Sequence, residues 1–219
     1  ASSHASTIVE TPKGMLAAWF GGKFEGDKEV NIYASWLVNN KWSAPFILAD
    51  GFINDSTRYA CYNPVLFLAP NNELLLFYKI GPYVQGWTGW MKRSTNYGAT
   101  WSKPERLPDG ILGPIRNQPY EVGDTIICPS STEKNGWKVH FEYTADAGKS
   151  WTKGPDLNDA NPITGIQPAN CLPLGMDGQH DLGGLLPAVI ENAFQHLDDE
   201  IHRCVVVIEH DNFIHRWCL

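Results

Sequence analysis

Three cationic side chains stand far apart in the sequence and together could bind a carboxylate. Arg58 precedes the run VLFL, Lys79 ends the run LLLFYK, and Arg116 interrupts a stretch rich in Gly and Pro. A guanidinium donates two parallel hydrogen bonds to a carboxylate, and an ammonium adds a point charge. The hypothesis needs a fold that brings the three segments together. The plainer interpretation is three solvated or structurally paired surface charges.

Proton transfer could come from a histidine and a glutamate. A histidine titrates near neutral pH, so His4 is a candidate acid or base, with a hydrogen-bonded core histidine as the alternative. Glu133 could transfer a proton or orient an arginine. Glu25, in GGKFEGD, is expected on a solvated rim loop instead.

A metal site is not expected. Ligand types for zinc gather near the C-terminus, but their spacings match no standard zinc pattern. They are His196, His202, Cys204, His210, His215 and Cys218. No cofactor motif stands elsewhere, so we expect no metal and no cofactor.

Charge and composition exclude two classes of partner. The net charge of −7, with no basic run, argues against nucleic acid. No apolar run approaches the roughly 20 residues of a membrane span. The 5 Cys are an odd number without a C-x-x-C pair, which favours buried free thiols over a disulfide framework.

An octamer occurs twice and marks the element that must position these residues. STNYGATW (94–101) and TADAGKSW (144–151) share one pattern of hydroxyl, Asn or Asp, Gly, hydroxyl and Trp. A degraded copy ends in NNKWSAP (39–45), so Trp42, Trp101 and Trp151 mark repeats with a period of 50 to 59 residues.

Each repeat combines several strand-like runs with Gly, Pro and Asn turns, which is typical of a β-propeller blade. Within the octamer, Asn96 or Asp146 can accept backbone N–H groups, and the following Gly can take a positive φ. The Trp can then pack between adjacent sheets. The octamer therefore predicts a structural turn without a catalytic role, in an all-β fold.

Longer motifs resemble one known family. HASTIVETPKGMLAAWFGG, NPVLFLAPNNELLLFYKIGP, WTGWMKRSTNYGATW, LPDGILGPIRNQP and PSSTEKNGWKVHFEYTADAGKSWT are similar to the sialidase-like β-propellers with BNR (Asp-box) repeats. The resemblance covers about residues 2 to 170. It implies blades of four antiparallel strands, usually six, around a central axis.

In such propellers the functional side chains come from the innermost strands and their loops. The resemblance therefore implies candidate catalytic residues at His4, Arg58, Lys79, Arg116 and Glu133. It implies candidate substrate-binding residues at Tyr62, Asn63, Asn117, Gln118, Ser131 and Gln167. The three cations among them would bind the carboxylate of an acidic sugar, making an acidic oligosaccharide or polysaccharide the expected partner.

The activity implied is hydrolysis of terminal acidic sugars, as in an exo-glycosidase. The chain departs from true sialidases because it has no early R-I-P motif, and neither Arg93 nor Arg106 is well placed for an arginine triad. One alternative is a polysaccharide lyase that cleaves rhamnose–glucuronate linkages, although Phe24 stands where such lyases carry a His. Another is a non-catalytic glycan-binding or remnant propeller.

The repeats predict an incomplete ring. Six blades of about 50 residues need roughly 300 residues, so we expect three to four blades in 1–170, the fourth beginning near Gln167. Residues 171–219 read as a truncated, frame-shifted or divergent segment, with a helical period in 187–202 and a strand at 204–208. An open ring predicts possible self-association. By resemblance, the protein is expected to be secreted or periplasmic.

Overall fold

The computed structural model describes residues 2–133, 138–157, 167–173, 204–210 and 213–218. Four antiparallel sheets follow one another along the chain, and we call them blades 1 to 4. Blade 1 contains β1 (Ser2–Thr11), β2 (Gly14–Gly22), β3 (Asn31–Val38), β4 (Lys41–Trp42) and β5 (Phe46–Ala49).

Blades 2 and 3 each have four strands in sequential order. Blade 2 contains β6 (Ala60–Leu68), β7 (Leu74–Gly81), β8 (Thr88–Ser94) and β9 (Glu105–Arg106), with a short 3₁₀ turn, η1 (Val84–Gly86), before β8. Blade 3 contains β10 (Tyr120–Val122), β11 (Thr125–Thr132), β12 (Lys138–Thr144) and β13 (Thr152–Lys153). Blade 4 has three described strands, β14 (Gln167–Pro173), β15 (Cys204–His210) and β16 (Phe213–Cys218).

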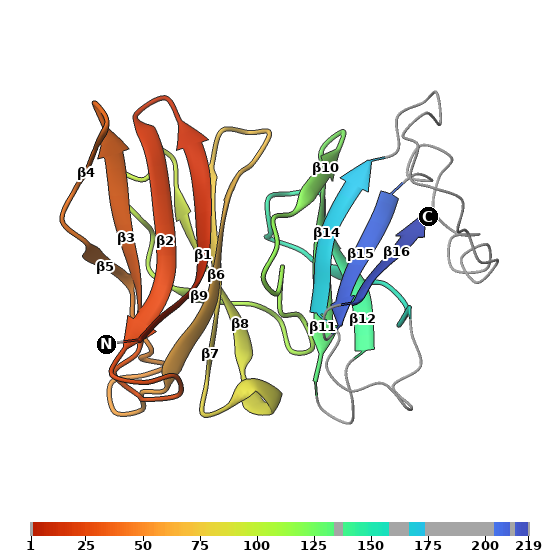
Figure 1. Ribbon diagram of the computed structural model, residues 1–219, viewed down its shortest axis with the longest axis horizontal. Coiled ribbons are helices and arrows are strands. Elements are labelled where there is room, and N and C mark those ends of the chain that lie inside the picture. Colours follow the sequence, from red (N-terminus) through yellow and green to blue (C-terminus); the bar gives the residue numbers. More distant parts are fainter. Residues whose placement is uncertain (1, 134–137, 158–166, 174–203, 211–212, 219) are drawn as a thin grey trace.

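The blades stand side by side in sequence order (Figure 1), and strands of neighbouring blades contact each other. β1 packs against β6, and β11 packs against β14. The chain is therefore all-β and forms part of a β-propeller, as predicted. β14 begins at Gln167 and β15 covers the strand predicted at 204–208, whereas the helical period in 187–202 lies outside the described residues.

Strand β7 is buried on both faces, which explains its unbroken apolar run. Leu74, Leu76 and Tyr78 belong to the core between blades 1 and 2. Leu75 and Phe77 point the other way, into the core between blades 2 and 3. Because strand side chains alternate, Lys79 falls on the blade 3 side with them and is 0% exposed.

Both octamers form closed turns held by their own side chains. In the second, the Thr144 hydroxyl accepts the N–H of Gly148 at 2.7 Å, and Asp146 accepts the N–H groups of Lys149 and Ser150 at 2.9 and 2.8 Å. In the first, Ser94 and Asn96 make the equivalent bonds to Gly98 and Thr100, at 2.8 and 2.9 Å. Gly98 and Gly148 have φ of 83° and 85°, as the sequence predicted.

Each octamer packs against the blade that precedes it. A Cβ on Gly98 would lie 2.9 Å from the Trp36 ring of blade 1, and one on Gly148 would lie 2.9 Å from Met91 of blade 2. The Trp151 ring meets Phe77 of blade 2 edge to face at 6.0 Å. Trp42, in the degraded copy of blade 1, is 52% exposed. These turns therefore help to hold neighbouring blades together.

Three of the candidate residues, Tyr62, Asn63 and Ser131, lie inside strands. Tyr62 and Asn63 belong to β6, because that strand begins at Ala60. Ser130 and Ser131 belong to β11, the second strand of blade 3, since its inner strand is the short β10. Within the described residues, no helix has the length and apolar character to cross a membrane.

The matching octamers supply a test of the turn. Asp146→Ala should lower the free energy of unfolding by about 1 to 2 kcal/mol, since the turn N–H groups lose their acceptor. Asp146→Asn, which copies Asn96, should retain most of that stability at neutral pH. Urea denaturation of the three proteins at pH 7 measures both effects.

The same proteins test the turn's acid sensitivity. Hydrogen bonds from the Ser150 side chain, and then from backbone N–H groups and Thr144, lower the pKa of Asp146 from 3.8 to about 2. The folded pKa lies below the unfolded one, so this stability is present above pH 3.8 and is lost as the pH falls towards 2. Asp146→Asn should lose less stability than wild type between pH 4 and pH 2. An equal loss in both proteins would contradict this assignment.

Candidate functional site

Two inner strands carry the same irregularity at the same end. β1 is bulged against β2 between His4 and Thr7, and β6 is bulged against β7 between Tyr62 and Val65. The residues within the bulges have positive φ, 49° at Ala5 and 40° at Asn63. A bulge inserts one residue into the ladder and redirects the side chains beside it.

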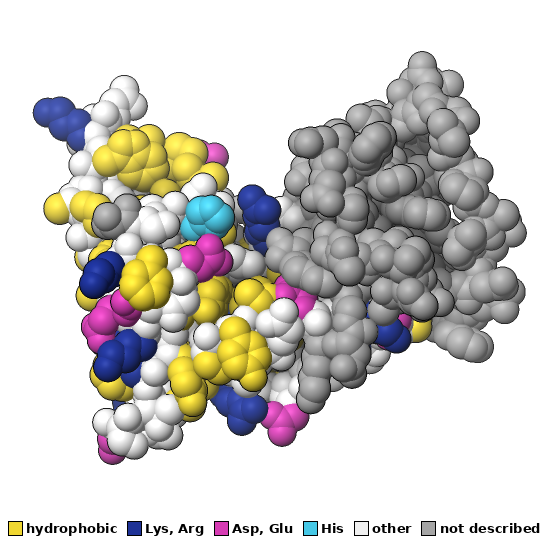
Figure 2. Space-filling model, turned by 60° about the horizontal axis from the view of Figure 1, so that its bottom comes forward, with side chains coloured by type: hydrophobic (Ala, Val, Ile, Leu, Met, Phe, Trp, Pro, Cys, Tyr) yellow, Lys and Arg dark blue, Asp and Glu magenta, His cyan; other side chains and the backbone are white. Residues whose placement is uncertain are grey.

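The bulges open onto a cleft of about 430 Å³. Its polar lining comes from three blades and includes five of the residues predicted from the sequence. The polar residues are His4, Glu25, Tyr62, Asn63, Gln85, Arg116 and Glu133, and Tyr83 and Trp87 add aromatic surface. Figure 2 shows a histidine on this face with acidic and basic side chains close to it.

A row of aromatic rings fixes the positions of His4 and Tyr62. The rings of His4 and Phe20 meet edge to face at 5.6 Å, Phe20 meets Tyr62 at 5.8 Å, and Tyr62 meets Trp87 at 5.6 Å. This geometry suits aromatic quadrupoles. Gly81 permits the close approach of Trp87, because a Cβ atom at position 81 would lie 2.4 Å from the Cα atom of Trp87.

The Tyr62 hydroxyl is neutral at physiological pH. Burial is the largest cause that raises its pKa above 10, followed by the negative charge of Glu25. Glu25 lies on the β2–β3 loop, whose Gly26 has a φ of 88° and approaches the Tyr62 hydroxyl. The sequence analysis expected Glu25 on a solvated rim loop, and in the structure it lies on an exposed loop that borders the cleft.

Arg116 reaches the cleft at the end of a connection that is wedged between blades 2 and 3. Lys79 of blade 2 donates to the Pro114 carbonyl at 2.5 Å. Glu142 of blade 3 accepts the N–H groups of Leu112 and Gly113, the latter at 2.6 Å. The connection is therefore held from both blades, and Arg116 itself is exposed.

The carboxylate of Glu142 collects further buried donors. The Ser130 hydroxyl donates to it at 3.2 Å, and His140 Nε2 lies 3.0 Å from it. All of these side chains are 0% exposed. Burial lowers the pKa of Lys79 to about 7, and the charge of Glu142 opposes this shift. The cluster thus serves to place the connection.

The three cations of the sequence hypothesis are not brought together. Only Arg116 lines the cleft, because Lys79 is enclosed between blades. Arg58 pairs with Glu29 at 2.7 Å, donates to Asn31 at 2.8 Å, and lies over the Phe52 ring.

The remaining predicted binding residues also lie apart from the cleft lining. Gln118 donates to the Ile8 carbonyl at 2.7 Å, and Ser131 is 0% exposed within β11. Asn117 is half-buried beside Arg116, on the same connection. The side chain of Gln167 lies outside what the structure describes, as do those of the zinc-type ligands between His196 and Cys218. Among the described residues, no three His, Cys, Asp or Glu side chains form a group able to hold a metal.

Fold and site together define a β-propeller with an open polar cleft at one end of its inner strands. A family model described as a BNR repeat-like domain matches residues 13–174. This is more than half of the sequence, so the chain belongs to the BNR repeat-like family, and the resemblance seen in its motifs is confirmed. No curated protein matches the chain in sequence.

Solved structures share the fold at low identity. A protein of unknown function from Dyadobacter fermentans aligns with a TM-score of 0.62 at 11% identity, over 95% of this chain and 66% of that one. A Hadza microbial sialidase aligns with a TM-score of 0.57 at 12% identity, over 75% of this chain and 41% of the sialidase chain. An endo-arabinase from Bacteroides thetaiotaomicron aligns with a TM-score of 0.55 at 11% identity, over 100% of this chain and 74% of the arabinase chain.

These likenesses show the fold, which this chain shares with β-propeller glycosidases. The chain spans only 66% and 41% of the Dyadobacter and sialidase chains.

The buried lysine gives a test of the connection's support. Lys79→Met should lower the free energy of unfolding by about 3 kcal/mol at neutral pH, because Glu142 loses its cation and Pro114 its donor. In wild type, the folded pKa of about 7 lies below the unfolded 10.5, so unfolding takes up a proton between these values and stability rises with pH.

The destabilisation by Lys79→Met should therefore grow by about 2.6 kcal/mol between pH 6 and pH 9. Denaturant titrations of both proteins at the two pH values measure this. Arg58→Met, which breaks an ion pair at the surface, is the matched control and should show no comparable dependence. A pH-independent difference for Lys79→Met would contradict a buried lysine that loses its proton.

Proposed function

We propose that the protein binds an acidic sugar in the cleft and hydrolyses the glycosidic bond that joins this sugar to a glycan. The observation that carries the proposal is the convergence of Arg116, His4 and two glutamates on one open cleft. The fold shared with sialidases and an arabinanase supports a carbohydrate as the ligand.

Arg116 is the group suited to the sugar carboxylate. It is exposed at the cleft, and the connection behind it is held by Lys79 and Glu142. A guanidinium on a rigid support loses little freedom when it forms two hydrogen bonds to a carboxylate. The flat surfaces of Tyr83 and Trp87 complete a mixed polar and apolar wall.

Glu25 and Glu133 are suited to the chemistry of hydrolysis. Glycoside hydrolysis uses two carboxyl groups, one as an acid at the leaving oxygen and one as a base or nucleophile. Glu133 is buried at 6% exposure, whereas Glu25 stands on an exposed loop. Two carboxyl groups in such different environments can take the two roles.

A second candidate reaction is β-elimination at a uronate, which His4 and Tyr62 favour. Elimination needs a base near C5 and an acid at the leaving oxygen. His4 is exposed at the cleft, and the neutral Tyr62 hydroxyl can donate a proton. Arg116 would neutralise the uronate carboxylate and so ease removal of the C5 proton.

Product masses separate these reactions. The folded protein should be incubated with sialylated and uronate-containing oligosaccharides, and the fragments measured by mass spectrometry. Fragments whose summed mass exceeds the substrate by one water indicate hydrolysis, as proposed. Fragments that sum to the substrate mass indicate elimination, and bound but uncleaved glycans indicate a non-catalytic propeller.

Arg116 supplies the direct test of carboxylate binding. Arg116→Ala should weaken binding of the acidic glycan by about 10-fold to 100-fold, since a charge-assisted bidentate contact is lost. Arg116→Lys should fall between this variant and wild type. The midpoint of thermal unfolding should stay unchanged in both, because the side chain is exposed. Unaltered glycan binding by Arg116→Ala would exclude the assignment.

A further inference from the structure

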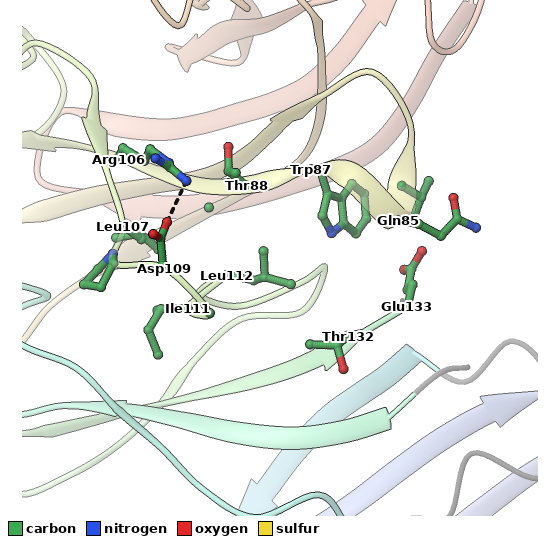
Figure 3. A pocket seen from close by; sticks show the side chains of 14 residues that line it. Gln85, Trp87, Thr88, Arg106, Leu107, Asp109, Ile111, Leu112, Thr132 and Glu133 are labelled. Atoms are coloured by element: carbon green, nitrogen blue, oxygen red, sulfur yellow. Dashed lines mark hydrogen bonds and ion pairs between the residues drawn. The ribbon is translucent and has the colours of Figure 1, made fainter. Parts of the chain in front are cut away.

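A second cavity of about 170 Å³ lies between blades 2 and 3, beside the cleft. Its walls come from three segments: the start of β8, the connection after β9, and the end of β11. Figure 3 shows Arg106 and Asp109 at one end, and Gln85 and Glu133 at the other. No candidate residue of the sequence hypothesis except Glu133 contributes to it.

The two cavities are neighbours and share part of their lining. Val84, Gln85, Trp87 and Glu133 border both. A ligand that fills the cleft and extends past Gln85 and Trp87 therefore enters the second cavity. The second cavity is smaller than the roughly 300 Å³ at which independent ligand pockets begin, so it suits an extension of a larger ligand.

The lining of this cavity suits a neutral polar ring. Ile111 and Leu112 give an apolar surface, as Figure 3 shows. At the rim, Arg106 Nη2 pairs with Asp109 Oδ1 at 2.7 Å, and both side chains are more than half exposed. Such a pair presents donors and acceptors to hydroxyl groups while its charges cancel.

Charge argues against a second acidic sugar here. The Arg106 cation is already paired with Asp109, and Glu133 adds a carboxylate at the opposite end. An anionic ligand would therefore meet no unpaired cation of the described lining. The hydroxyl groups of a neutral sugar can form hydrogen bonds with Arg106 and Asp109 at the rim, and its ring can lie on the apolar surface below.

We propose that this cavity is a subsite for the neutral sugar next to the acidic unit in the cleft. The protein then recognises two or more linked sugars, and a free acidic monosaccharide is a weaker ligand than an oligosaccharide that carries it. This inference rests on the proposed function, since it takes the acidic unit to lie against Arg116.

The test compares short and long ligands by titration calorimetry. The probes are sialic acid with sialyllactose, and glucuronic acid with a trisaccharide that ends in glucuronic acid. Asp109→Ala should weaken binding of the longer member of the bound pair by about fivefold to tenfold, as expected for lost hydrogen bonds. Binding of the monosaccharide should not change.

Glu29→Ala is the matched control, because it breaks the Arg58–Glu29 pair of equal length outside both cavities. It should bind every probe as wild type does. If Asp109→Ala binds the oligosaccharide as wild type while Arg116→Ala has lost it, the subsite is overturned and the proposed function stands. If wild type binds none of the probes, the proposed function fails, and the subsite fails with it.

Discussion

The structure around the cleft depends on two buried charged groups that grip one connection from opposite sides. Lys79 reaches from blade 2 to the Pro114 carbonyl, and Glu142 reaches from blade 3 to the N–H groups of Leu112 and Gly113. Both side chains are fully buried, so each must find hydrogen-bonding partners or destabilise the fold. The connection supplies them. It also lies between the blades and brings Arg116 to the cleft and Asp109 to the neighbouring cavity.

The rest of the fold follows from the need of each blade to cover two faces. Strand β7 sends alternate side chains into two different cores, so its blade has little stability without both neighbours. The octamer turns meet the same need at the outer edge, since Gly98 and Gly148 allow close contact with Trp36 and Met91 of the preceding blades. Stability and cleft geometry are thereby coupled, because the cleft draws its residues from three successive blades.

Within this frame the cleft is built from irregular backbone. The bulges beside His4 and Tyr62 and the turn at Gly26 interrupt regular structure at one end of the inner strands. The row of rings from His4 to Trp87 then gives these irregular segments a rigid packing. A rigid scaffold with only the local backbone adapted is suited to holding site residues in fixed positions.

The sequence by itself determined the blades and the turns between their outer strands, because the signals for both are local. An octamer contains the hydrogen-bonding side chains of its own turn, and the unbroken apolar run in LLLFYK is typical of a strand that is buried on both faces. The sequence also indicated five candidate residues that line one cleft: His4, Tyr62, Asn63, Arg116 and Glu133.

Only the tertiary structure decided which cation points to the cleft and which is enclosed. Lys79 and Arg116 are both candidate cations in the sequence. The register of β7 places the Lys79 side chain in the core between blades, whereas the connection supported by distant residues leaves Arg116 exposed at the cleft. The positions of Glu25 at the cleft and of Arg106 at the neighbouring cavity likewise arise from contacts between segments far apart in the chain. The direction of such side chains is set by bulges and packing across blades, and these leave no periodic trace in the sequence.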